Sequence, residues 1–239
     1  MTNIQKTVEK TNEISNAEFE YSTTSDFNFI EQLDDNCTAI VMDATVIMFE
    51  IQNIGILLKT GKRHTAKVYK LFYHTLREVC ESTGGQFNCY SPKHFLLIYP
   101  KDKVEVQKVV DIAIKTANLL SITLRETIEQ HTHLNFGFGV DCGKILGTKA
   151  FDENNYPHMA WFGRTVEKAL ALSHLSQRPF FVSISRSAYH QLDESLKTTT
   201  KKILGIKKQV DIWTRVHYEF QNEKKYMYQT NLSRSFETD

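Results

Sequence analysis

Two consecutive glycines near the middle of the chain, Gly84-Gly85, are the feature that most restricts how it folds. The preceding segment, 65–82, carries apolar residues at helical spacing, and the glycines predict its end because they readily adopt the left-handed backbone found at helix ends. The following segment, 86–99, has the pattern of two strands joined by a tight turn that contains Pro92. The sequence therefore predicts a helix that leads directly into a β-hairpin, with Lys93 in the hairpin turn.

The composition favours one globular domain in the cytoplasm. The chain has 239 residues, of which 41% are hydrophobic and 24% are charged, so it can bury a substantial core. A net charge of +1 gives no strong field for nucleic acid or an anionic membrane, and neither is an expected partner. No apolar run approaches the roughly 20 residues that cross a bilayer, so no membrane segment is predicted. The four cysteines lack C-x-x-C spacing and no secretory signal precedes them, which predicts reduced thiols in a cytoplasmic protein.

The rest of the chain alternates short apolar runs with amphipathic segments. A buried strand is expected over 37–43, ending in Asp43, and a long amphipathic helix over 102–130. Gly137 and Gly139 fall in a later strand, where glycines usually mark the close approach of another backbone. Further strands are expected over 134–140, 144–147, 159–162 and 180–184, a turn over 141–143, helices after Gly163 and over 185–192, and a last strand pair around 204–213. This order predicts an α+β fold, a sandwich with helices packed on a mostly antiparallel central sheet.

Three regions are expected from the polarity of the sequence. Residues 1–35 are polar and are interpreted as a tail or docking arm, with a short amphipathic helix over 12–19 as one option and disorder as the other. Residues 36–216 contain the predicted strands and helices. Residues 217–239 are polar and are interpreted as a C-terminal tail.

Five landmarks follow one another within the region 36–216. The first two are the strand ending in Asp43 and the helix that leads into Gly84-Gly85 and the hairpin. The other three are the segments 138–147 (FGVDCGKILG), 163–172 (GRTVEKALAL) and 204–210 (LGIKKQV). In this order and spacing they resemble the catalytic domain of the class III nucleotidyl cyclases, the adenylate and guanylate cyclases.

This resemblance implies a particular kind of active site. Two such domains form a head-to-tail homodimer or heterodimer, and each side donates a different half of the site to a nucleoside triphosphate. One domain supplies two carboxylates for two Mg²⁺ or Mn²⁺ ions, which activate the attacking hydroxyl. The other supplies a base-reading lysine and acid, an orienting asparagine, and an arginine that stabilises the transition state.

The chain departs from the family in the half that binds metal. Asp43 aligns with the first metal carboxylate, although a carboxylate at a strand end also caps backbone amides. The second carboxylate aligns with Lys93, which repels Mg²⁺, so Mg²⁺ or Mn²⁺ is expected only if the site is active. Lys93 and His94 are interpreted either as cations that hold a phosphate or as an ordinary solvated turn. The equivalent of the phosphate loop is bulky where the family usually has glycine, and consists of Ala44, Thr45, Val46, Ile47 and Met48.

The other half of the site departs as well. Cys89 aligns with the base-reading lysine and His158 with the base-reading acid. The asparagine aligns with Glu167 and the arginine with Ala171. Outside the family pattern, His131 and His133 have the spacing of a zinc-chelating pair, or belong to the surface at a helix end.

These substitutions support three hypotheses. The first is a pseudocyclase, an inactive or strongly impaired dimerising module that binds nucleotide or regulates a partner. The second is an active divergent cyclase for a purine or pyrimidine nucleotide, alone or as half of a heterodimer. The third is an oligomerisation module with no nucleotide site.

Overall fold

The computed structural model describes residues 3–18, 20–27, 38–127, 134–151, 157–203 and 206–236. The helices are α1 (Asn3–Asn16), α2 (Ile54–Leu58), α3 (Lys62–Ser82), α4 (Val106–Thr127), α5 (Arg164–Leu175), α6 (Arg186–Tyr189) and α7 (Glu194–Lys197). The strands are β1 (Glu20–Thr23), β2 (Thr38–Ile51), β3 (Gln86–Ser91), β4 (His94–Pro100), β5 (Phe136–Phe151), β6 (Pro157–Phe162), β7 (Val182–Ser185), β8 (Thr198–Ile203), β9 (Ile206–Asp211), β10 (Thr214–Phe220) and β11 (Glu223–Thr230).

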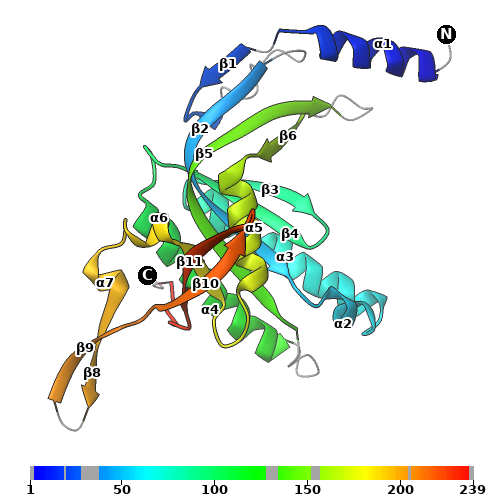
Figure 1. Cartoon of the computed structure of the whole chain (residues 1–239). Coiled ribbons are helices and arrows are strands. Elements are labelled where there is room, and N and C mark those ends of the chain that lie inside the picture. Colours follow the sequence, from blue (N-terminus) through cyan, green and yellow to red (C-terminus); the bar gives the residue numbers. More distant parts are fainter. Residues whose placement is uncertain are drawn as a thin grey trace.

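A large central sheet organises the molecule (Figure 1). Its strand order is β10-β11-β7-β5-β2-β4-β3, with β1 added to β2 and β6 added to β5. The β1–β2 and β5–β7 pairs are parallel, and the other pairs of this sheet are antiparallel. The predicted α+β class with a mostly antiparallel sheet is therefore confirmed.

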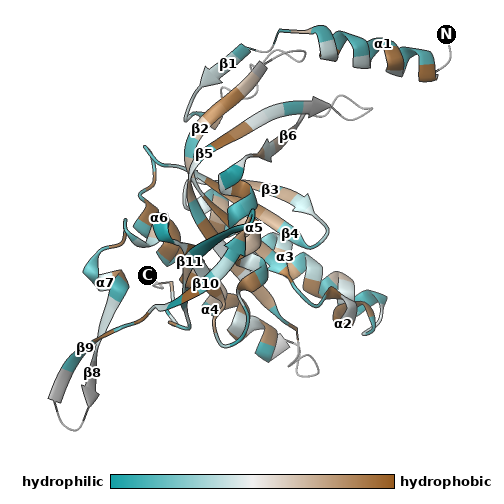
Figure 2. Ribbon diagram, in the orientation of Figure 1, coloured by the Kyte–Doolittle hydropathy of each residue, from teal (hydrophilic) through white to brown (hydrophobic). Residues whose placement is uncertain are grey.

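The central strand β2 is twice as long as predicted. It runs for 14 residues from Thr38 to Ile51, so the expectation that it ends at Asp43 is wrong. Side chains alternate between the two faces of a strand. Odd-numbered residues such as Ile47 and Phe49 pack with α3 and α4 in one core cluster, whereas even-numbered residues such as Val46 and Met48 pack with α5 in another. Apolar residues therefore continue through the strand because both of its faces are covered, as the brown colour of β2 in Figure 2 indicates.

The strand β5 is also continuous, and the predicted turn over 141–143 is wrong. Its pairing with β2 runs without interruption from Phe136 to Thr148. The prediction for Gly137 and Gly139 is confirmed, because a Cβ atom at either position would collide with the backbone of α5. These glycines therefore let α5 lie directly on the sheet, next to the even-numbered face of β2.

The predicted helix and hairpin around the two glycines are confirmed. Helix α3 ends at Ser82, and Gly84 follows with a φ of 83°, in the left-handed region that glycine tolerates best. Strands β3 and β4 then pair as an antiparallel hairpin. The hairpin tip is held near the end of β2, because β4 pairs with β2 from Pro100 to His94.

The predicted C-terminal tail over 217–239 is wrong in its described part. Strands β10 and β11 form a hairpin, and β11 pairs with β7 inside the central sheet. Met227, Gln229 and Thr230 are buried there. The segment appears polar because polar side chains alternate with the buried ones and because two of the buried residues are themselves polar.

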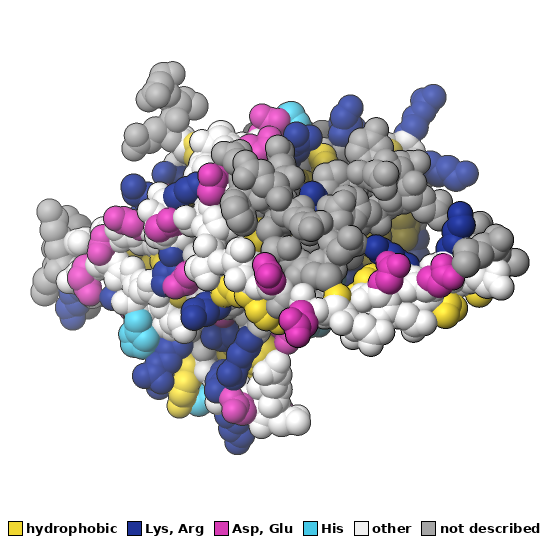
Figure 3. Space-filling model, turned by 90° about the horizontal axis from the view of Figure 1, so that it is seen from above, with side chains coloured by type: hydrophobic (Ala, Val, Ile, Leu, Met, Phe, Trp, Pro, Cys, Tyr) yellow, Lys and Arg dark blue, Asp and Glu magenta, His cyan; other side chains and the backbone are white. Residues whose placement is uncertain are grey.

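The predicted N-terminal arm contains more regular structure than expected. Helix α1 begins at Asn3, extends away from the sheet, and exposes nearly all of its described side chains, while β1 adds a short strand to β2 (Figure 1). Of the residues described, no helix is long and apolar enough to cross a membrane. Basic and acidic side chains lie among one another on the face seen in Figure 3, in keeping with the net charge of +1.

Candidate functional site

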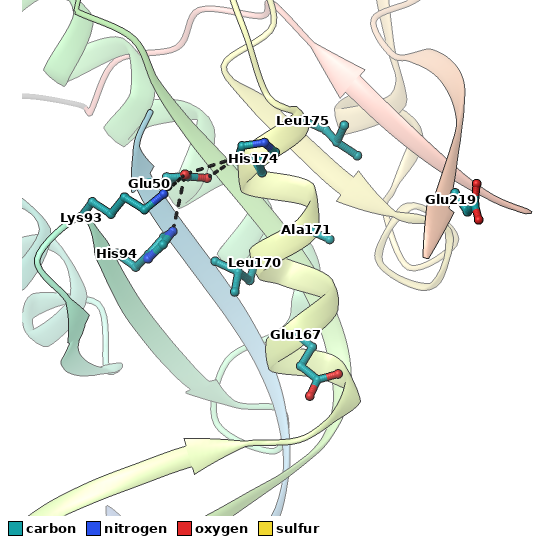
Figure 4. Close-up of a pocket in the computed structure, with 9 residues that line it drawn as sticks. All are labelled: Glu50, Lys93, His94, Glu167, Leu170, Ala171, His174, Leu175 and Glu219. Carbon is teal, nitrogen blue, oxygen red and sulfur yellow. Dashed lines mark hydrogen bonds and ion pairs between the residues drawn. The ribbon is translucent and has the colours of Figure 1, made fainter. Parts of the chain in front are cut away.

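The turn of the β3–β4 hairpin brings Lys93 onto a carboxylate at the end of β2. Lys93 Nζ lies 3.1 Å from Glu50 Oε1, and His94 Nε2 lies 3.5 Å from the same oxygen. His174 reaches the carboxylate from α5, with its Nδ1 atom 3.4 Å from Glu50 Oε2. Figure 4 shows the three side chains converging on Glu50. We refer to Glu50, Lys93, His94 and His174 as the Glu50 cluster.

Local geometry holds these groups in place. Glu50 and His94 are register partners on β2 and β4, so the strand pairing itself sets their separation. Ser91 Oγ lies 2.8 Å from His94 Nδ1, which directs the other ring nitrogen toward Glu50. Gln52, just beyond the end of β2, donates to the backbone oxygens of Ser173 at 2.9 Å and His174 at 3.2 Å and so anchors the end of α5.

Glu50 is charged despite being buried. Only 1% of it is exposed. Burial raises the pKa of its carboxyl, but hydrogen bonds from His94, Lys93 and His174 outweigh that effect and bring the pKa to about 2, below the reference value of 4.5. The folded state therefore favours the ionised form of Glu50 more strongly than the unfolded state does.

Glu50→Gln is expected to remove part of the acid sensitivity of folding. Because the folded pKa is depressed, the stabilisation from Glu50 is present above pH 4.5 and is lost as the pH falls toward about 2. A shift of this size corresponds to about 3 kcal/mol. Urea unfolding between pH 2 and pH 6 should show a stability gap between the parent chain and the variant that closes on acidification.

Glu219→Gln removes the same charge from an exposed position near the cluster and serves as the matched control. Parallel stability curves for the parent chain and Glu50→Gln across this pH range would contradict the role assigned to the Glu50 carboxylate.

A pocket of about 500 Å³ opens beside the Glu50 cluster, between the hairpin tip, α5 and β10. Glu167 and Ala171 of α5 line it together with Lys93, so the structure brings together three of the positions predicted from the sequence. Leu170 and Leu175 add apolar surface, and Glu219 of β10 adds a further carboxylate (Figure 4). The pocket therefore combines one neutralised carboxylate with two more acids and no arginine.

The residues present do not fit the two-metal site that the resemblance implies. Mg²⁺ and Mn²⁺ favour oxygen-rich shells, and Mg²⁺ usually takes one or two carboxylates together with phosphate and water oxygens. Here Lys93, which the resemblance aligns with the second carboxylate, pairs with Glu50 through its ammonium group. In the described part of the chain, no group of three or more His, Cys, Asp or Glu side chains is placed to hold a metal ion.

Asp43 lies far from this pocket, so the expectation that it stands opposite Lys93 is wrong. It is 56% exposed at its side chain and lies 3.7 Å from Lys101 Nζ. Seven residues of strand separate Asp43 from Glu50, roughly 23 Å at the rise of an extended strand. An odd spacing also turns the two side chains to opposite faces.

The assignment of a phosphate loop is corrected as well. Ala44, Thr45, Val46, Ile47 and Met48 lie inside β2, paired with β4 on one side and β5 on the other, and all five are buried. Their bulk fills the two cores of the molecule. They do not crowd an anion site.

The other predicted site residues are placed as follows. Cys89 lies on β3 with its Sγ 3.8 Å from Tyr69 Oη, and it does not line the pocket. On β6, the backbone of His158 pairs with that of Ala150 on β5. The side chain of His158 lies outside the described part of the structure, as do His131 and His133. Leu204 and Gly205 of the last landmark lie outside them too.

Sequence reasoning missed Glu50, His174 and Glu219. The available signal for Glu50 was that the apolar run does not stop at Asp43 but continues to Phe49, so that a second carboxylate stands at its end. His174 could have been placed near the site, since it lies three residues after Ala171 and therefore on the same helix face. Glu219 had no such signal, because the strand that carries it was interpreted as a tail.

Comparisons with known proteins test the family resemblance. The sequence matches no protein-family model and no curated protein. The fold matches the adenylyl cyclase CyaB from P. aeruginosa with a TM-score of 0.61 and 13% identity, covering 82% of this chain and 97% of that one. It matches a class III adenylyl cyclase-like ATP-binding protein from Pseudomonas aeruginosa with a TM-score of 0.63 and 16% identity, covering 80% of this chain and 43% of that one.

A third match is the guanylate cyclase domain of RhGC from Catenaria anguillulae, in a complex with GTP. Its TM-score is 0.55 at 14% identity, over 81% of this chain and 99% of that one. Identities this low establish a shared fold and leave the chemistry to be argued from the residues. The chain has the fold of the catalytic domains of class III adenylyl and guanylyl cyclases.

Proposed function

We propose that this chain is a cyclase-fold domain without two-metal catalysis, which acts as a dimerising nucleotide-binding or regulatory module. The observation that carries the proposal is the ion pair between Lys93 Nζ and Glu50 Oε1, 3.1 Å apart. It replaces a pair of metal-binding carboxylates with one carboxylate and a tethered cation.

The ion pair opposes metal binding in two ways. Lys93 neutralises the Glu50 carboxylate, which lowers its attraction for a divalent ion. A metal ion bound to Glu50 would also stand close to the Lys93 ammonium, and like charges repel at close range. Activation of a nucleotide hydroxyl by two metal ions therefore has no support from the side chains of this site.

Ala171 leaves the site without the arginine that would stabilise the transition state. It lines the pocket at the position that aligns with the transition-state arginine, and alanine supplies no charge to a developing negative centre. Loss of one such electrostatic group typically lowers a rate by about a hundredfold to a thousandfold. The missing arginine and the Lys93–Glu50 ion pair together favour a role in binding or regulation over catalytic turnover.

Related structures support the dimer and nucleotide parts of the proposal. One solved relative is described as a dimeric guanylyl cyclase domain, another is in a complex with GTP, and a third is described as an ATP-binding protein. The pocket of this chain offers Lys93 and two histidines for phosphate, but Glu167 and Glu219 oppose an anion. A nucleotide held here would therefore bind without metal and more weakly than in an enzyme with a full metal site.

Assays on the purified chain test for catalysis, nucleotide binding and dimerisation. Each of ATP, GTP, CTP and UTP is incubated with Mn²⁺ and assayed for cyclic nucleotide, and thermal shift is measured with each one in EDTA. We expect no cyclic product, and a dimer by light scattering. Mn²⁺-dependent product that disappears in Glu50→Gln would overturn the proposal and establish the alternative, an active divergent cyclase. A dimer that shows no thermal shift with any nucleotide would restrict the function to oligomerisation or regulation.

A further inference from the structure

An apolar groove lies outside the pocket, where α2 meets the first half of α3. It has a volume of about 590 Å³, and Leu57, Leu58, Tyr69 and Pro92 line it. Leu58 is 62% exposed, and its neighbour Ile56 is 39% exposed. Figure 2 shows hydrophobic colour on α2 at the margin of the molecule. We refer to this surface as the α2–α3 groove.

Basic side chains are concentrated on the segment that forms the α2–α3 groove: Lys62 and Lys70 line it, and three more lie close to them in the sequence. The cations are exposed and comprise Lys59, Lys62, Arg63, Lys67 and Lys70. The sequence has no Asp or Glu between residues 51 and 77. Within the described part of the chain, none of these five cations has an ion-pair partner. A chain with a net charge of only +1 therefore concentrates unpaired positive charge around an apolar hollow.

The beginning of α3 adds to this positive charge. Its first turn contains no acidic residue, and its N-cap, Gly61, provides no side-chain hydrogen bond. A helix N-terminus carries partial positive charge and free amide groups, which acidic side chains usually satisfy. Lys62 and Arg63 stand there instead, so this end of a 21-residue helix lacks the acidic side chains that usually stabilise it.

We propose that the α2–α3 groove is the docking site of an acidic amphipathic helix from a partner protein. The apolar face of that helix would fill the hollow beside Leu57, Leu58 and Tyr69, and its acidic face would meet the surrounding cations and the start of α3. A concave cavity accepts protruding side chains, whereas a membrane surface presents no ridge to fill it. The geometry therefore favours a peptide helix over a lipid bilayer.

The α2–α3 groove adjoins the hairpin turn that carries Lys93 of the Glu50 cluster. Pro92 lines the groove and directly precedes Lys93, which pairs with Glu50 on the other side of the hairpin turn. A partner in the groove would contact the turn that positions Lys93. The groove itself is separate from the pocket and does not depend on nucleotide binding.

A designed peptide tests the proposal with the full chain. The probe is a fluorescein-labelled helix of about 18 residues with leucine on one face and glutamate on the other. A scrambled peptide of the same composition and a version with lysine in place of glutamate are the peptide controls. Fluorescence anisotropy measures their binding, and sedimentation with phosphatidylserine vesicles is measured in parallel.

Three variants locate the binding. Lys62→Glu with Lys70→Glu reverses two charges at the groove, Ala66→Trp fills the hollow, and Lys108→Glu with Lys224→Glu makes the same charge change elsewhere. We expect the acidic peptide to bind the parent chain, with its affinity lowered about tenfold or more by each groove variant and unchanged by the control. Circular dichroism and thermal unfolding verify that the variants are folded.

Several outcomes would overturn the proposal. They are the absence of binding by the acidic peptide, equal binding of the scrambled peptide, and an affinity that neither groove variant changes. Vesicle binding that depends on Lys62 and Lys70, without peptide binding, would assign the surface to a membrane instead.

Discussion

Replacing Lys93 with aspartate is expected to create a divalent-metal site at the hairpin turn. In Lys93→Asp, the shorter carboxylate would face Glu50 across the space now filled by the end of the lysine side chain, whose Nζ lies 3.1 Å from Glu50 Oε1. A metal ion could occupy that space, and His94 offers a third ligand. Among the described residues, Glu50 Oε2 is buried and has only the 3.4 Å ion-pair contact with His174 Nδ1, with no hydrogen bond of its own. We expect Mn²⁺ to bind about tenfold or more tightly than to the parent chain, a difference of about 1.4 kcal/mol.

Calorimetric titration with Mn²⁺ measures the gain in Mn²⁺ affinity, and the melting temperature with and without Mn²⁺ gives an independent measure of binding. Without metal the two carboxylates repel, so the variant should unfold at a lower temperature in EDTA and recover with Mn²⁺. Lys108→Asp makes the same charge change at an exposed site and is the matched control. If Lys93→Asp binds Mn²⁺ no better than Lys108→Asp, or still binds it with Glu50→Gln added, residues 50 and 93 do not form the two halves of a metal site.

Gly139→Ala is expected to be the most destabilising small substitution in the chain's core. The added methyl group would meet the backbone of Ala169 and Ser173, and backbone atoms cannot move aside without shifting α5 from the sheet. We expect a loss of about 3 kcal/mol or more in the free energy of unfolding, equivalent to a fall of about 10 °C in melting temperature for a chain of this length.

Gly55→Ala provides the control for this experiment. Gly55 lies in α2 with open space around the position of a Cβ atom, and alanine is the better helix former. Urea unfolding of this variant should therefore show unchanged or slightly raised stability. Equal losses in the two variants would mean that the effect at Gly139 comes from chain flexibility and not from contact with α5.

Short-range sequence patterns were sufficient to predict much of the fold. Gly84-Gly85 and Pro92 act within their own turns, so the helix, the hairpin and the tip position of Lys93 could be read directly from neighbouring residues. Gly137 and Gly139 likewise indicated a close backbone contact, although not which helix makes it. Glu167 and Ala171 were assigned to the site through the resemblance of segment 163–172 to the cyclase family, and both line the pocket.

Elements that depend on pairing between distant segments were predicted wrongly. The strand β11 appears polar in the sequence, yet it lies between β10 and β7 and contributes Met227 to the core. The expected turn at 141–143 is absent because these residues belong to β5 and pair with β2 without a break. A strand is recognised by its neighbours in the sheet, and these are far away in the sequence.

The sequence alone determined the helix, the hairpin and the position of Lys93 at its turn, because glycine and proline act locally. Its resemblance to the class III cyclases supplied the cyclase-like α+β fold and the expectation of a metal-binding acid at position 93. Only the tertiary structure decided which carboxylate Lys93 faces. Asp43 and Glu50 stand on the same strand and both follow apolar residues, but seven residues of extended chain place them on opposite faces. The pairing of Glu50 with His94 across β2 and β4 then selects Glu50, so the register of the sheet defines the site.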